Sequence, residues 1–300
     1  MTTSPQLISV RRAVLGEGLG IDRALPSRQL RTIGAWCFLD HLGPVRVQNG
    51  QGGIDVGPHP HIGLQTFTWM IKGHIWHQDS LGFKQLISPK QVNLMTSGEG
   101  IVHTEETPAD TQDELLHSVQ LWIALPEGHK HIGPAFEHYP ELPQFQHDGV
   151  DMILLVGSLL GHTSPVRLHS ALLATELYAT EAKTVRLPLQ PEFEYGVMVL
   201  EGQADVNDTL SLDNQTLVYL PVGGDSLTLR LGANTRVFVL AGEPLAQSPL
   251  LWWNFVADDH ETVAAAREDW VSGAPRFGDV VGYAGERMAA PELVGRLKRK

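Results

Sequence analysis

The sequence predicts an all-β fold in which two copies of one β unit are followed by a C-terminal helical segment. Short alternations of apolar and polar residues recur between clusters of Gly, Pro, Asn and Asp, which is the pattern of half-buried strands joined by turns. A weak internal repeat relates the two halves of the chain. Convincing helical patterns are few, and the clearest occurs near the C-terminus.

Two segments illustrate the strand pattern. TFTWMIKG (66–73) alternates Phe, Trp and Ile with Thr, Thr and Met, and SVQLWIALP (118–126) alternates Val, Leu and Ile with polar or aromatic residues. Side chains two apart share a face of a strand, so each segment has one continuous apolar face. Both segments are therefore predicted to be strands that cover a core.

The internal repeat relates MIKGHIW (70–76) to VLEGQADV (199–206), since each has apolar residues, a charged residue and then Gly. Two copies of one β unit explain this similarity. The segment 139–150, YPELPQFQHDGV, is rich in Pro and polar residues and is a natural junction. We therefore expect an N-terminal domain over 1–147, a C-terminal domain over 148–245, and a helix and tail over 246–300.

The helical pattern is DDHETVAAAREDWVSG (258–273). Asp258 and Glu261 have the spacing of a capping box, an alanine-rich interior follows, and Gly273 supplies the stop signal.

Composition limits the classes of function. The net charge of -12 argues against direct binding to nucleic acid. The one cysteine, Cys37, has no internal partner for a disulfide and is expected to be buried and inert. No run is long and apolar enough to span a membrane, and no signal-peptide pattern is present. We expect a cytoplasmic protein that binds neither membrane nor nucleic acid.

Histidine is concentrated in the first half: of 14 histidines, only His162, His169 and His260 lie beyond residue 150, which leaves 11 before it. In PHPHIG, His59 and His61 are two residues apart, so both imidazoles lie on one face of an extended strand. His103 and Glu105 in GIVHTEE have the same spacing. Nucleotide-binding glycine motifs and the nucleophile elbow of hydrolases are absent.

Two such pairs on antiparallel neighbours would bring three imidazoles and one carboxylate to one ion. Imidazole suits Fe, Zn, Ni or Cu, and carboxylate is compatible with Fe and Mn. Four protein ligands leave positions open for water or substrate. The alternative is that each pair is only a polar face on a strand. His77 is a candidate hydrogen-bonding neighbour of the site.

Four motifs in this order, FLDHLGP, HPHIG, GHIWHQDSLG and MTSGEGIVHTEE, resemble the pirin family of the cupin superfamily. The resemblance covers nearly the whole chain. It implies a bicupin: two jelly-roll β-barrels with a C-terminal segment packing back on them. It also implies one divalent metal in the N-terminal cupin, held by His59, His61, His103 and Glu105, and no ligand set in the second cupin. Iron(II) is the metal implied, with Zn, Ni, Cu, Co or Mn as alternatives.

One stretch departs from the family pattern. Pirins commonly read HPHRGFET, whereas this chain has Ile62 in place of the Arg and Gln65 in place of the Glu. The two exchanges remove one positive and one negative charge near the expected site, which leaves pocket polarity and substrate choice open.

The resemblance leaves three functions open. The first is a quercetin 2,3-dioxygenase-type enzyme that opens a flavonol or related planar aromatic with O2, with Glu105 as general base. Met95, Trp76 and Phe83 are candidate walls of its pocket. The second is a metal- or redox-dependent regulator that binds a protein partner, either a transcription factor or a metabolic enzyme. The third is a scaffold that has lost its site.

Overall fold

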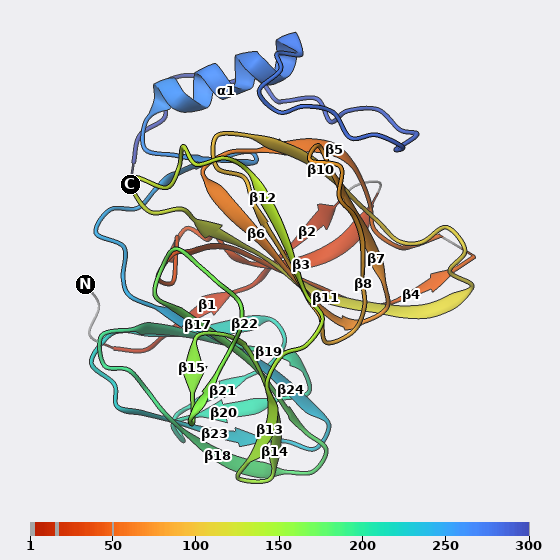
Figure 1. Ribbon diagram of the computed structural model, residues 1–300. Coiled ribbons are helices and arrows are strands. Elements are labelled where there is room, and N and C mark those ends of the chain that lie inside the picture. The colour runs from red at the N-terminus through yellow and green to blue at the C-terminus, as the bar shows by residue number, and fades with distance from the viewer. Residues whose placement is uncertain (1–3, 16–17, 50, 300) are drawn as a thin grey trace. The chain divides into compact units, whose positions relative to one another are not determined.

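The structure is a computed structural model that describes residues 4–15, 18–49 and 51–299. Strands dominate these residues, and the helix α1 (His260–Ser272) lies near the C-terminus (Figure 1). The predicted all-β class with a C-terminal helical segment is confirmed. No helix in the described ranges has the length and hydropathy needed to cross a membrane.

Two compact units divide the chain. Unit 1 combines residues 1–12, 22–41 and 141–246, and unit 2 combines residues 13–21, 42–140 and 247–300. The division thus differs from a single cut at residue 147, because an early segment, 22–41, groups with the second half of the chain. Such a grouping depends on long-range pairing, which local composition does not encode.

The predicted metal-binding residues lie in unit 2, where a four-stranded sheet contains the pair His59 and His61 and the pair His103 and Glu105. Its strands have the order β5 (Asp55–His61), β10 (Ile101–Glu106), β7 (Ile75–Asp79) and β8 (Lys84–Ile87). A seven-stranded sheet has the order β12 (Ala135–Tyr139), β9 (Val92–Thr96), β6 (Leu64–Lys72), β11 (Asp113–Ala124), β4 (Trp36–Gln48), β3 (Leu19–Leu25) and β2 (Arg11–Leu15). Strands β3 and β4 pass from one unit to the other along the chain.

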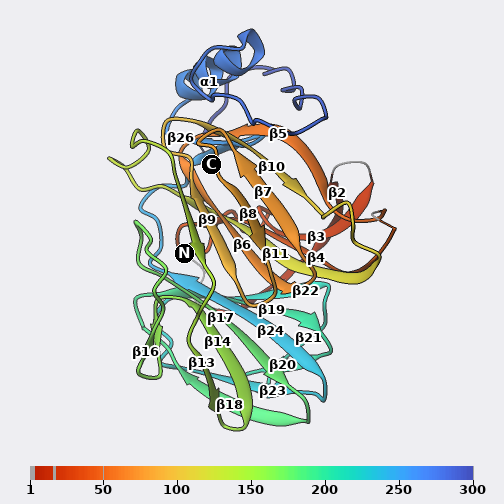
Figure 2. The same ribbon diagram turned by 45° about the vertical axis from the view of Figure 1, so that its right-hand side comes forward.

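Unit 1 repeats this topology. One sheet has the order β1 (Gln6–Ser9), β22 (Thr216–Leu220), β19 (Glu194–Glu201), β24 (Thr235–Gly242), β17 (Leu172–Ala179), β14 (Val150–Val156) and β13 (Gln144–His147). The other has the order β18 (Lys183–Pro188), β23 (Ser226–Leu231), β20 (Ala204–Val206) and β21 (Leu210–Leu212), and both sheets are visible in Figure 2. A short hairpin, β15 (Ser158–Leu159) and β16 (His162–Thr163), completes the unit. Strands β18, β23, β20 and β21 follow the order of β5, β10, β7 and β8, so the internal repeat is confirmed.

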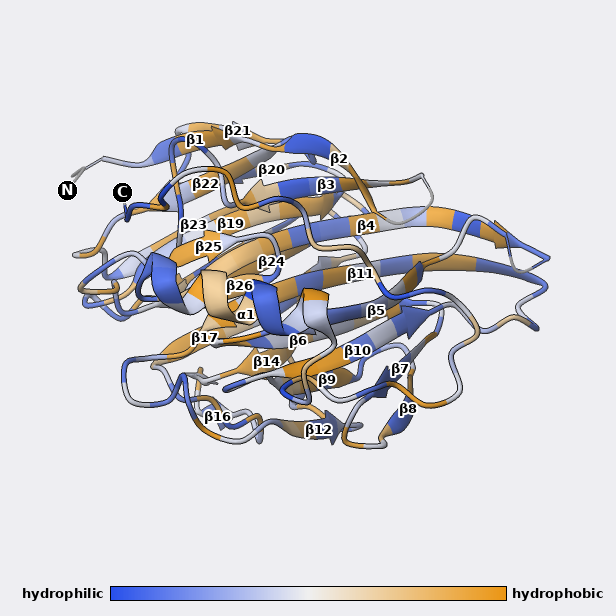
Figure 3. Ribbon diagram, turned by 90° about the horizontal axis from the view of Figure 1, so that it is seen from above, coloured by the Kyte–Doolittle hydropathy of each residue, from blue (hydrophilic) through white to orange (hydrophobic). Residues whose placement is uncertain are grey.

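The inward faces of the strands form the cores. In unit 1 the buried cluster includes Val150, Leu177, Val197, Val218 and Val239 from five different strands. Figure 3 shows the corresponding long apolar stretches on the strands. The predicted strands 66–73 and 118–126 are confirmed as parts of β6 and β11, which pair antiparallel. Cys37 is buried and in no disulfide, as expected.

The C-terminal segment packs against the outer side of β5 and β10 within unit 2 (Figures 1 and 2). Ile62 and Val102 share an apolar cluster with Phe255, from the hairpin β25 (Leu250–Trp252) and β26 (Phe255–Ala257), and with Trp270 of α1. Phe255 also forms a parallel bridge with Ile62. The apolar residue at position 62 therefore serves this packing.

The helix begins one residue later than the capping pattern predicts. Its N-cap is Asp259, whose carboxylate accepts a hydrogen bond from the Thr262 amide at 2.7 Å. Asp258 is instead engaged by Lys130 and by Arg299. Gly273 ends the helix in the left-handed conformation with φ of 72°, as predicted.

Candidate metal centre

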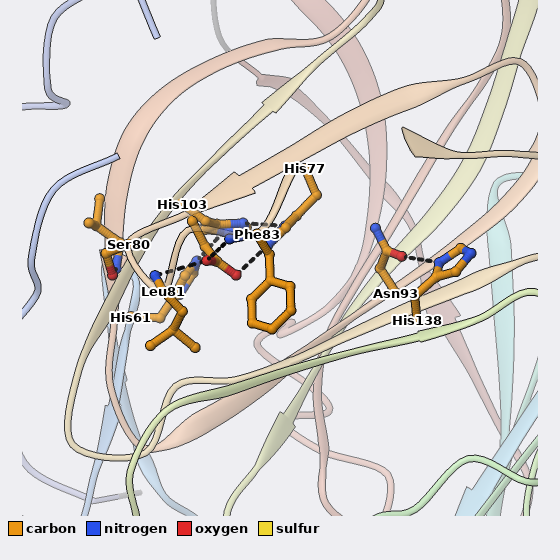
Figure 4. Close-up of polar contacts among 10 residues, drawn as sticks. His61, His77, Ser80, Leu81, Phe83, Asn93, His103 and His138 are labelled. Carbon is orange, nitrogen blue, oxygen red and sulfur yellow. Dashed lines mark hydrogen bonds and ion pairs between the residues drawn. The ribbon is translucent and has the colours of Figure 1, made fainter. Parts of the chain in front are cut away.

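Strands β5 and β10 pair antiparallel, with His59 directly opposite His103. The side chains of His59, His61 and His103 are all buried, and they offer ligand nitrogens that lie within 4.8 Å of one another. The Nε2 atoms of His61 and His103 are 3.2 Å apart (Figure 4). The structure therefore brings the three predicted histidines to one point.

Hydrogen bonds orient two of these rings. His59 Nδ1 lies 2.9 Å from the Gly57 carbonyl oxygen, and His61 Nδ1 lies 3.0 Å from the Asn254 carbonyl oxygen. A carbonyl only accepts, so each Nδ1 carries the proton and each Nε2 keeps its lone pair. Both rings thus present an unprotonated nitrogen to the common point.

A chain of two hydrogen bonds orients the third ring. His77 Nε2 lies 3.0 Å from a carboxylate oxygen of the buried Asp79, and His77 Nδ1 lies 3.3 Å from His103 Nδ1. Because the carboxylate only accepts, His77 carries its proton on Nε2 and accepts at Nδ1. His103 must then donate from Nδ1, which leaves its Nε2 unprotonated. The other carboxylate oxygen of Asp79 accepts from the amides of Leu81 and Phe83.

Burial keeps the three rings neutral. It lowers the pKa of His59 from 6.5 to about 4, and it lowers the pKa values of His61 and His103 well below 6.5. At neutral pH, facing lone pairs 3.2 Å apart repel each other unless a cation lies between them. Neutral imidazoles with converging lone pairs are the donor set that a divalent transition metal prefers, so the residues fit a bound metal.

Glu105 lies on the same face of β10 as His103 but outside the group of three ligand nitrogens. It pairs with His77 of β7, and its carboxyl group lies near the Thr68 side chain of β6, whose hydroxyl donates to the Gln120 side chain at 2.8 Å. Burial raises the pKa of Glu105 to about 7, and the nearby Thr68 hydroxyl only partly offsets that rise. A carboxyl that is half ionised near neutral pH is suited to proton transfer.

The local geometry of β5 follows from its sequence. The ladder with β10 shifts register between His103 and Glu105, because His103 lies opposite His59 whereas Glu105 lies opposite Val56. The extra residue is thus on β5, at Gly57 and Pro58, residue types that suit a bulge. This bulge places the Gly57 carbonyl where His59 donates to it.

Ile62 and Gln65, which replace the Arg and the Glu of the family pattern, bring no charge to the group of three histidines. Gln65 lies on the same face of β6 as Phe67 and donates from Nε2 to Thr96 at 2.9 Å. Thr68, which reaches Glu105, lies on the opposite face. Ile62 packs under the C-terminal segment.

The three candidate wall residues have different positions. Phe83, 46% exposed, contacts Phe136, whose ring stacks on His77 at 4.4 Å. Met95 is buried and pairs with Phe136 and with Thr66. Trp76 alternates with His77 along β7 and packs under Lys84, so it faces away from the histidines.

Two positioning residues, Asp79 and Asn254, are not among the residues predicted from sequence. Asp79 had a signal, since His77 and Asp79 repeat the two-residue spacing of the ligand pairs. Asn254 contributes only a backbone carbonyl from a distant segment, so no side-chain pattern marks it. The remaining histidines serve elsewhere: for example, His138 pairs with Asn93 away from the site (Figure 4).

Two repeated β units, one of them with a buried group of three neutral histidines, define a bicupin protein with a site suited to a metal. Comparison with family models agrees, since residues 18–123 match the Pirin model and residues 174–278 match the Pirin C-terminal cupin domain. The chain belongs to the pirin family, and its two cupin domains are those of that family.

Three of its relatives are similar over nearly their full lengths. A Pseudomonas aeruginosa protein named "Putative quercetin 2,3-dioxygenase" is 48% identical over 97% of this chain and 91% of its own. A pirin-like protein of Caulobacter vibrioides is 32% identical over 95% of this chain and 99% of its own. A crystal structure titled as quercetin 2,3-dioxygenase from Acinetobacter baumannii is 50% identical, covers 98% of this chain and 97% of its own, and has a TM-score of 0.95.

The Asp79 carboxylate sets the tautomer of His77 and, through it, that of His103. We expect Asp79→Asn to lower metal affinity by about 10- to 100-fold, because the amide no longer enforces a lone pair on His103 Nε2. Competition titration with a chromophoric chelator measures this change. Glu106→Gln, on the opposite face of β10, is the matched control and should leave affinity unchanged. Equal affinities for Asp79→Asn and the wild type would contradict the orienting role.

Proposed function

We propose that this protein is a metal-dependent dioxygenase of the quercetin 2,3-dioxygenase type, which acts on a flavonol or related planar aromatic with O2. The observation that carries the proposal is the buried group of His59, His61 and His103 with converging lone pairs. The names of relatives at 48% and 50% identity support the substrate class. Iron(II) is the proposed metal, with Zn, Ni, Cu, Co or Mn as alternatives.

In this proposal the three histidines hold the metal, which supplies Lewis acidity toward the flavonol oxygens and a centre for O2 chemistry. Glu105 takes the proton of the substrate hydroxyl on its carboxylate, since burial has raised its pKa to about 7. Turned away from Thr68, the same carboxylate is the proposed fourth ligand. Each of these roles needs the side chain to face the histidines, as its position on β10 allows.

Aromatic side chains next to the histidines suit a planar substrate. Phe136 stacks on His77, and Phe83 extends this row of rings to the surface. Offset stacking of a flavonol ring on such side chains would orient it and exclude water from the reacting oxygens. We propose Phe83, Phe136 and Met95 as walls of the substrate site.

Oxygen uptake on quercetin tests the proposal. Purified protein loaded with iron(II), and separately with each alternative metal, is expected to consume O2 only when quercetin is present. Chelator-treated protein is the control and should consume none. If protein with one metal per chain takes up no O2 on any flavonol, the proposed enzymatic activity is contradicted. That result would favour the alternative, a regulator that binds a protein partner. The cytoplasmic location and the lack of nucleic-acid binding remain predictions from composition.

A further inference from the structure

Unit 1 contains a cavity of about 120 Å³, which is partly open to solvent at the exposed residues Ser158 and Pro188. Its lining is mostly apolar and comes from β17, β18, β19, β24 and the hairpin of β15 and β16, with Leu173, Leu187, Leu189, Tyr195 and Val239 as the residues used below. Four of these side chains are buried, and Leu189 is partly buried. This cavity is not part of the histidine site, because every lining residue belongs to unit 1.

The cavity lies beside the strand of unit 1 that corresponds to β5, which carries His59 and His61 in unit 2. Strand β18 corresponds to β5 and β23 to β10, so Leu187-Pro188-Leu189 stands where the first copy has His59-Pro60-His61. The ladders agree, since Leu187 lies opposite Leu227 as His59 lies opposite His103. The same barrel position has therefore become apolar, which suits an apolar molecule in place of a metal.

One buried polar group of the lining can donate a hydrogen bond to a bound molecule. The Tyr195 hydroxyl oxygen accepts a hydrogen bond from the Gln190 amide at 2.8 Å, and among the described residues its own proton has no acceptor. Burial raises the pKa of Tyr195, so the hydroxyl stays protonated at neutral pH. The other buried hydroxyl of the lining, Thr175, already donates to the Ile153 carbonyl. Tyr195 is thus a buried available donor in a lining that is mostly apolar and that also includes the polar side chains of Ser158 and Gln190.

We propose that this cavity binds a small uncharged molecule with one aromatic ring and one oxygen acceptor, held by apolar packing and by a hydrogen bond from Tyr195. At about 120 Å³ the cavity is somewhat smaller than the apolar cavity of about 150 Å³ that accommodates benzene, so it has room for no more than one ring. A three-ring flavonol is too large for it. The lining has no ionised side chain to compensate a charge, so a charged guest would pay an uncompensated desolvation cost.

Calorimetric titration of the full chain with acetophenone, and with ethylbenzene as the analogue without an acceptor, tests the proposal. Acetophenone is expected to bind more tightly. Tyr195→Phe should weaken acetophenone by about fivefold, the usual effect of one lost hydrogen bond, and leave ethylbenzene unchanged. The double variant His59→Ala/His103→Ala should bind both probes as the wild type does, which separates this site from the metal site.

A filling variant checks the location. Leu189→Phe is expected to extend into the cavity and weaken both probes by more than about tenfold, because overpacking a site of this size leaves no room for a ring. Leu210→Phe is the matched control, since Leu210 packs against the same core outside the cavity lining. Thermal melts verify that both variants fold. No binding of either probe by the wild type, or equal binding by Leu189→Phe, would overturn the proposal.

Discussion

The double variant His59→Ala/His103→Ala is expected to lose its metal completely, from about one metal per chain to below about a tenth. Only one imidazole of the group, that of His61, would remain, and a single neutral nitrogen does not hold a divalent ion against buffer and chelator. Mass spectrometric metal analysis of protein that has been loaded and then dialysed measures the loss. Retention of metal in the variant would contradict the assignment of the three histidines as ligands.

A control with the same number of histidines removed excludes a general effect of histidine content. His74 pairs with Glu114, and His138 pairs with Asn93, both outside the ligand group. The variant His74→Ala/His138→Ala should therefore retain about one metal per chain, as the wild type does. Oxygen uptake on quercetin should follow metal content in all three proteins if the proposed enzyme is correct.

Glu105→Gln is expected to lower kcat for quercetin oxidation by about 10²- to 10⁴-fold, the usual contribution of a general base. Glutamine matches the shape of the side chain but accepts no proton, whereas the three histidines remain to bind the metal. We therefore expect loaded Glu105→Gln to keep about one metal per chain on the three histidines, although the loss of the proposed fourth ligand weakens the binding. Glu106→Gln is the matched control, because the Glu106 carboxylate accepts hydrogen bonds from Gln78 and Thr104 and is not part of the proposed site. An unchanged kcat in Glu105→Gln would contradict the role as base.

The pH dependence provides a second test of Glu105. The base form of a carboxyl exists above its pKa, so activity should rise with pH as Glu105 loses its proton. That pKa is about 7 in the metal-free protein, and a bound cation lowers it by favouring the carboxylate. The rising limb of the kcat profile is thus expected at or below pH 7, and it should be absent in Glu105→Gln.

Much of the site was predictable because strand geometry is local. Residues two apart on an extended strand share a face, so His59 and His61 form one pair and His103 and Glu105 another, whatever the rest of the fold does. The structure then brings the three histidines together, whereas the Glu105 carboxyl lies outside that group, near Thr68 of a different sheet. A side chain with several rotatable bonds chooses between such partners by packing, which residue spacing does not encode.

The helix cap and the candidate wall residues also depended on tertiary contacts that residue spacing does not encode. The cap moved from Asp258 to Asp259 because Lys130 and Arg299 engage Asp258 from distant segments. Trp76 has the right residue type for a wall, but the alternation of β7 turns it away from His77.

By itself the sequence determined the all-β class, the internal repeat, the histidine pairs and the membership in the pirin family, since periodicity and motif spacing are properties of short segments. Only the tertiary structure decided that Asp79 and the Asn254 carbonyl set the tautomers of His103 and His61, and that residues 22–41 group with the second half. It also decided that an apolar cavity with Tyr195 lies beside the strand of unit 1 that corresponds to β5. The reason is physical: each of these features also depends on at least one contact between segments that lie far apart in the sequence, and the energies of such contacts exist only once the barrels have closed.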